Sequence, residues 1–84
     1  MDTPSQDTGK LPLLESFGAA VRQYRKERGY SQEAFGHACG IDRSYMGGIE
    51  RGEHNLALVN IMKIVRALNM KPSEFFKALD DAEF

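Results

Sequence analysis

Apolar residues recur every three or four positions along most of the chain, and glycine or proline separates one run from the next. This spacing gathers apolar side chains on one face of a helix. No run alternates between apolar and polar residues for long enough to suggest a strand. The pattern predicts an all-α fold of five helices, over residues 13–28, 32–39, 43–51, 58–68 and 72–79.

Capping and stop residues support these limits. Ser31 and Asp42 are suitable N-caps for the second and third helices, because their side chains can accept from free backbone amides. Gly29, Gly40 and Gly52 follow the ends of the first three helices, where glycine commonly ends a helix. The second and third helices are therefore short and joined by a glycine-containing turn, which is the arrangement of a helix-turn-helix unit.

The length of 84 residues indicates a single small domain. We expect a polar N-terminal arm over residues 1–12, the helical domain over 13–79 and an acidic tail over 80–84. A single Cys excludes an internal disulfide, and one Cys with two His cannot build a usual four-ligand zinc site. We expect no metal or other cofactor, no catalytic constellation and therefore no enzyme.

The sequence contains no apolar run long enough to cross a membrane and no signal peptide at its start, so we expect a cytoplasmic protein. The net charge is −1, from 11 basic and 12 acidic residues. Segments 1–10 and 80–84 hold one basic and five acidic residues, which leaves a net charge of +3 between them. A basic excess of that size can still follow the phosphates of a nucleic acid if it gathers on one face.

Segment 31–52, which has the sequence SQEAFGHACGIDRSYMGGIERG, resembles the lambda-repressor-like (Cro/Xre-type) helix-turn-helix family. Segments 55–68 and 72–76 look like the fourth and fifth helices of that family. Within the match, segment 42–52 also resembles the small controller regulators of restriction–modification systems. The resemblance implies a five-helix DNA-binding domain that acts as a homodimer on a pseudo-palindromic operator, with the third helix in the major groove.

The third helix carries the candidate base contacts. If Met46 and Ile49 face the core, the first turn presents its polar side chains outward. Arg43 can donate two hydrogen bonds to the O6 and N7 atoms of guanine, and Ser44 can donate or accept. Tyr45 lies to one side, within reach of a phosphate or a thymine methyl group. We therefore predict that Arg43, Ser44 and Tyr45 recognise bases.

Gly47 and Gly48 are predicted on the same outward face, where each costs about 1 kcal/mol of helix propensity relative to alanine. We expect them to allow a close approach of the helix backbone to DNA. Gly48 would then contribute no side chain to base recognition.

The family resemblance implies that Gln32, at the start of the second helix, contacts a phosphate and supports the recognition helix. Such contacts position a protein on DNA but carry no sequence information. The other residues expected to contact the DNA backbone are Arg22, Arg51, His54 and Asn55.

Arg25 and Glu50 are expected to form a structural ion pair. Arg25 follows Val21 by four residues and Glu50 follows Met46 by four, so both lean toward the edge of the core. A half-buried charge needs a partner, and members of the family commonly pair these two positions.

Phe75, Phe76 and Leu79 supply more apolar surface than one face of a terminal helix needs, so we expect them at a dimer interface. The expected partners are therefore double-stranded DNA and a second copy of the chain, with no membrane and no small-molecule effector. The alternative function is a protein-interaction module or an antitoxin-like partner built on the same fold. Steep salt dependence of binding to duplex DNA would distinguish a regulator from such a module.

Overall fold

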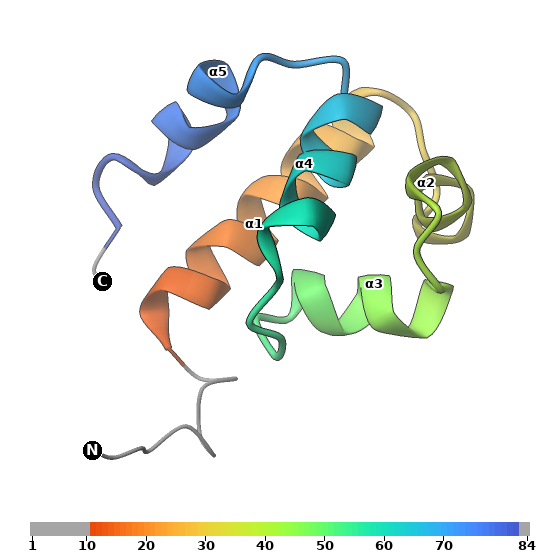
Figure 1. Cartoon of the computed structure of the whole chain (residues 1–84), viewed down its shortest axis with the longest axis horizontal. Coiled ribbons are helices and arrows are strands. Elements are labelled where there is room, and N and C mark those ends of the chain that lie inside the picture. Colours follow the sequence, from red (N-terminus) through yellow and green to blue (C-terminus); the bar gives the residue numbers. More distant parts are fainter. Residues whose placement is uncertain (1–10, 83–84) are drawn as a thin grey trace.

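The computed structural model describes residues 11–82, and these form five α-helices followed by one turn of 3-10 helix, with no strand among them (Figure 1). The predicted all-α class with five helices is confirmed. The elements are α1 (Pro12–Glu27), α2 (Gln32–Cys39), α3 (Arg43–Glu50), α4 (Leu58–Ala67), α5 (Pro72–Phe76) and the 3-10 turn η2 (Lys77–Leu79).

The ends of the domain differ from the predicted limits. Pro12 was expected in the polar arm but is the first residue of α1, where a proline lacks only an amide that would have no partner within the helix. The predicted helix 72–79 is an α-helix only as far as Phe76, and its last turn tightens into η2. Most of the predicted arm, residues 1–10, and the end of the predicted acidic tail, residues 83–84, lie outside the described residues.

The two helices of the helix-turn-helix unit cross steeply, since α2 is seen end-on in Figure 1 while α3 lies across the view. Gly40 caps α2 in the left-handed conformation, with φ of 71°. A Cβ atom on Gly36 would lie 2.7 Å from the carbonyl oxygen of Ile41, so only glycine fits where α2 packs against the turn. Each helix starts as predicted: the Ser31 hydroxyl accepts from the Ala34 amide at 3.0 Å, and the Asp42 carboxylate accepts from the Ser44 amide at 2.9 Å.

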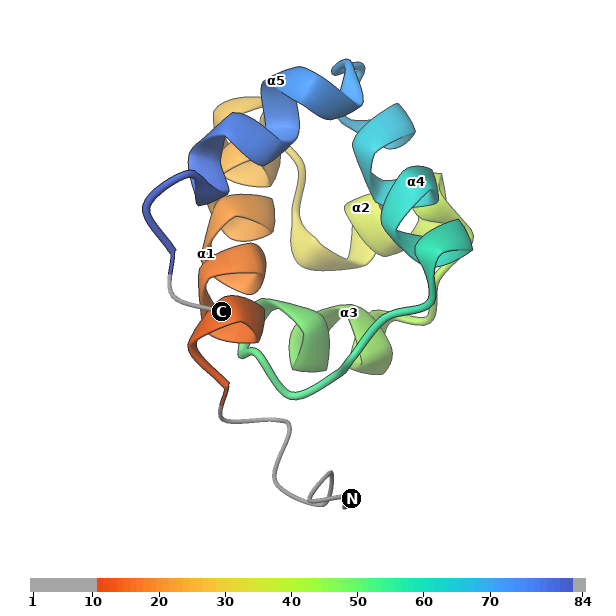
Figure 2. The same ribbon diagram turned by 60° about the vertical axis from the view of Figure 1, so that its left-hand side comes forward.

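One apolar core joins all the helices, and its largest fully buried side chains come from α1 to α5. Cys39 belongs to this core, and burial raises the pKa of its thiol to about 11. The thiol therefore stays protonated and unreactive at neutral pH. Figure 2 shows α5 lying across the top of the molecule beside α1.

The contact between α1 and α5 corrects the predicted dimer interface. Phe75 is fully buried, with its ring centroid 5.3 Å from that of Phe17, and Leu79 is only 7% exposed. Phe75 is therefore a core residue of the single chain and offers no surface to a second copy, whereas Leu79 still lines an open surface hollow with Leu13 and Phe76. Phe76 is half-buried, 6.5 Å from Phe17 between ring centroids. The apolar excess of this segment serves mainly to attach a short terminal helix to α1.

Candidate nucleic-acid interface

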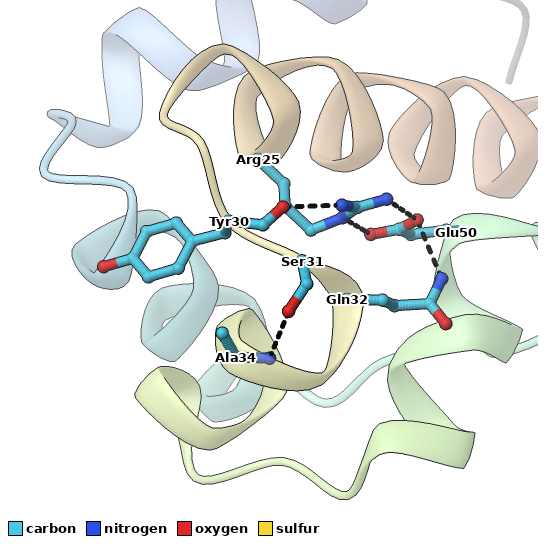
Figure 3. Close-up of polar contacts among 6 residues, drawn as sticks. All are labelled: Arg25, Tyr30, Ser31, Gln32, Ala34 and Glu50. Carbon is cyan, nitrogen blue, oxygen red and sulfur yellow. Dashed lines mark hydrogen bonds and ion pairs between the residues drawn. The ribbon is translucent and has the colours of Figure 1, made fainter.

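The inner edge of α3 is held by a buried ion pair between α1 and α3. Arg25 donates to the Glu50 carboxylate from Nε at 2.7 Å and from Nη2 at 3.0 Å (Figure 3). The Glu50 side chain is 3% exposed and that of Arg25 is 9% exposed. This two-point contact fixes orientation as well as distance, because the planar guanidinium matches the carboxylate.

Neighbouring groups complete this network. Arg25 also donates from Nη1 to the Tyr30 carbonyl at 2.8 Å, and the Gln32 amide donates to Glu50 at 3.0 Å. Among the described residues, no buried side-chain nitrogen or oxygen lacks a hydrogen-bond partner. The network therefore ties the start of α2 and the end of α3 to α1, and it fixes the direction in which α3 points.

A glycine brings the two helices close enough for this pair to form. A Cβ atom on Gly18 of α1 would collide with the carbonyl oxygens of Ile49 and Glu50. Backbone atoms cannot rotate away as a side chain can, so the close approach of α1 to α3 requires glycine at this position.

The outer edge of α3 begins with two exposed polar residues, Arg43 and Ser44, directly after the Asp42 cap. Within residues 11–82, no carboxylate forms an ion pair with Arg43. A shallow polar hollow opens beside them, lined by Gln32, Arg43, Ser44, Gly47 and Arg51. The structure thus brings together, from α2, α3 and the residue after α3, four of the side chains predicted to contact DNA.

Gly47 and Gly48 are buried, which corrects the expectation that they expose the helix backbone to DNA. A Cβ atom on Gly47 would lie 3.1 Å from Arg51 Nη1 and 3.3 Å from Gln32 Oε1. A Cβ atom on Gly48 would overlap the imidazole of His54. The two glycines therefore make room for side chains from other segments to lie across the helix.

The loop after α3 brings His54 onto the exposed side of the helix. In Figure 2 this loop runs back along α3 before α4 begins. The His54 imidazole stacks on the Tyr45 ring, with centroids 4.1 Å apart and planes 13° from parallel. His54 thus belongs to the surface of α3 beside a predicted base contact. Gly48 was the one feature of the sequence that could have indicated this position of His54, because glycine leaves space for a ring against the helix.

Glu53 is a residue of this surface that no sequence pattern predicted. Its carboxylate accepts from Arg51 Nε at 2.8 Å and from Nη2 at 3.1 Å, and this contact raises the pKa of the Arg51 guanidinium. The side chains are 62% exposed for Arg51 and 41% for Glu53. Arg22 of α1 and Asn55 of the loop are exposed, but neither lines the polar hollow.

Comparison with known proteins agrees with this geometry. The helix-turn-helix family profile matches residues 21–75, which covers α2 and α3 and most of the fold. The chain therefore belongs to the helix-turn-helix family of the Cro/Xre type, a class of DNA-binding transcription regulators and not of enzymes.

Its individual relatives include control proteins. The chain is 42% identical over 68 residues to the control protein C.BamHI of Bacillus amyloliquefaciens, covering 80% of this chain and 82% of that protein. It is 38% identical over 65 residues to the control protein C.MunI of a Mycoplasma species, covering 76% and 88%. The crystal structure of the restriction-modification controller protein C.AhdI from Aeromonas hydrophila matches with a TM-score of 0.72 and 48% identity, covering 75% of this chain and 96% of that one.

Within the part of the chain that the structure describes, no helix has both the length and the hydropathy needed to span a membrane.

Proposed function

We propose that this chain is a sequence-specific transcription regulator that inserts α3 into the major groove of duplex DNA. One observation carries the proposal: α3 is fixed at its inner edge by the Arg25–Glu50 pair, while Arg43 and Ser44 stand exposed at its first turn. A recognition helix needs both properties, because discrimination between bases depends on side chains held in register with the groove.

The residues around the hollow divide into two roles. Arg43 and Ser44 contact base edges, and Tyr45, held by its stack on His54, contacts a base or phosphate at the side of the helix. Gln32 and Arg51, across the hollow, and His54 contact the DNA backbone. Arg22 and Asn55 make flanking backbone contacts. The backbone contacts set the register that lets the first group discriminate between bases.

We further propose that a second copy covers the start of α4. Leu58 and Val59 are 70% and 65% exposed, and Met62 lies beside them. Two adjacent large aliphatic side chains in water on so small a domain favour self-association, since covering one such side chain contributes about 1.5–3 kcal/mol. A two-fold contact places the same patch on both copies and gives two α3 helices for the two halves of a pseudo-palindromic operator.

The similarity to C.BamHI and C.AhdI supports a role in controlling restriction–modification genes. We propose that the concentration of the chain, through dimerisation, sets operator occupancy, and that no small-molecule effector takes part. Such a regulator works in the cytoplasm, where bacterial DNA lies.

Selection of binding sites from a random duplex pool tests the proposal. We expect an enriched consensus with two-fold symmetry and a binding constant that falls steeply with salt, with a slope of several units per dimer. The Arg43→Ala variant, carried through the same selection, should enrich a consensus with reduced preference at one position in each half. No enrichment, together with weak and salt-independent binding, would contradict the proposal and favour a protein-interaction module.

A further inference from the structure

The guanidinium of Arg51, which the proposed interface directs at a phosphate, is already occupied by the Glu53 carboxylate. Two hydrogen bonds join them, at 2.8 and 3.1 Å. The same guanidinium lies over Gly47 and lines the hollow that Arg43 and Ser44 share. Arg51 therefore meets DNA as one half of a pair, whereas Arg43 meets it without a partner among the described residues.

A carboxylate binds a guanidinium in the same two-point manner as a phosphate does. Glu53 is tethered two residues from Arg51, so its effective concentration is high, on the order of millimolar or above. A phosphate that approaches Arg51 must therefore displace the carboxylate. Only a phosphate delivered to the right place and angle can recover both hydrogen bonds, while a loosely placed phosphate cannot.

We propose that Glu53 is a specificity-determining residue, which keeps Arg51 from phosphates of non-cognate DNA and releases it to the operator. This inference rests on the proposed function, because it requires α3 to dock on duplex DNA. On the operator, base contacts by Arg43 and Ser44 fix the register of α3, so a phosphate reaches Arg51 in a constant position. On other DNA sequences the register of α3 in the groove varies, and Glu53 stays hydrogen-bonded to Arg51.

The exposure of the two side chains supports this assignment. Both side chains are accessible, 62% exposed for Arg51 and 41% for Glu53, so the pair can open without disturbing the core. An exposed pair contributes little to folding. Substitution of Glu53 therefore changes DNA binding with little effect on the fold, in contrast to the buried Glu50.

The test compares two duplexes, one carrying the selected site and one with the same bases scrambled. With Glu53→Gln, we expect binding to the scrambled duplex to strengthen about threefold to tenfold, and its slope of log K against log salt to steepen by about 0.9 per protomer, since one more phosphate is neutralised. Binding to the selected duplex changes less, and the ratio between the two affinities falls.

Two further variants separate competition from a simple change of charge. Glu33→Gln removes an exposed carboxylate from α2, and we expect it to affect both duplexes equally without changing the slope. In an Arg51→Ala background, Glu53→Gln should have no greater effect than Glu33→Gln. Equal effects of Glu53→Gln with and without Arg51, or an unchanged affinity ratio, would overturn the inference while leaving the proposed function intact. Failure of the unsubstituted protein to prefer the selected duplex would instead overturn the proposed function and this inference with it.

Discussion

The helices on either side of the loop 52–57 differ in how well the single chain caps their ends and covers their side chains. α3 starts on the Asp42 cap and ends at Glu50, whose charge is buried against Arg25. α4 begins at Leu58, which is 70% exposed, and the preceding residue, Ala57, has no side chain that can cap the helix. The chain therefore satisfies the polar groups of α3 by itself and leaves apolar surface of α4 uncovered.

The contrast between α3 and α4 separates what one chain provides for DNA binding from what we propose that two chains provide together. A single chain holds α3 in the direction that DNA recognition requires. For the exposed start of α4, we propose that a second copy covers it. Disturbing α3 should accordingly damage the fold, whereas disturbing the start of α4 should damage only assembly.

The largest expected effect is on the α3 side, at Glu50. Glu50→Ala should lower the free energy of unfolding by about 3–5 kcal/mol, because it leaves the Arg25 charge buried without a carboxylate. Urea denaturation measures this loss. Replacing both partners, as in Arg25→Met with Glu50→Leu, should cost less than Glu50→Ala alone. A double variant as unstable as the sum of its own single variants, Arg25→Met and Glu50→Leu, would show that the pair is not coupled.

Gly18→Ala should have a somewhat smaller effect on the same contact. The added methyl group must push α1 away from the Ile49 and Glu50 carbonyls, which we expect to cost about 2–3 kcal/mol after the gain in helix propensity is included. Ala19→Gly, at the next and exposed position of α1, should cost only about 1 kcal/mol. Thermal unfolding of both variants makes the comparison, and a stabilised Gly18→Ala would contradict the close contact.

On the α4 side, Leu58→Lys should leave folding nearly unchanged and weaken the dimer. We expect a loss of about 1.5–3 kcal/mol per protomer, which over both protomers raises the dimer dissociation constant by a factor of about a hundred or more. Sedimentation equilibrium measures this change. The control is Ala78→Lys, which changes an exposed position near Phe76, a residue that the sequence predicts at the dimer interface. Dimers lost in Ala78→Lys but kept in Leu58→Lys would place the interface on η2 instead.

Local patterns were sufficient to predict most of the fold. The N-caps at Ser31 and Asp42 and the turn at Gly40 depend on residues close in sequence, and each is found in the structure. The five helices likewise follow from apolar spacing within each segment. The end of α5 differs because its last turn tightens as Leu79 enters the core.

The candidate site was harder to predict because its details depend on loops that fold back. Gly48 was expected to face DNA, but the position of His54 over it is set by the path of residues 52–57, which no local pattern encodes. Phe75 was expected at a dimer interface, since sequence shows how much apolar surface a helix has but not which neighbour covers it.

Recognition of bases by the exposed first turn of α3 can be measured with Arg43→Ala on the selected duplex. We expect a loss of about 1–3 kcal/mol of preference for one base in each half-site, with little change on the scrambled duplex. The control, Arg22→Ala, should weaken both duplexes alike. If Arg43→Ala weakens binding to both duplexes equally and every base preference is retained, Arg43 does not recognise a base.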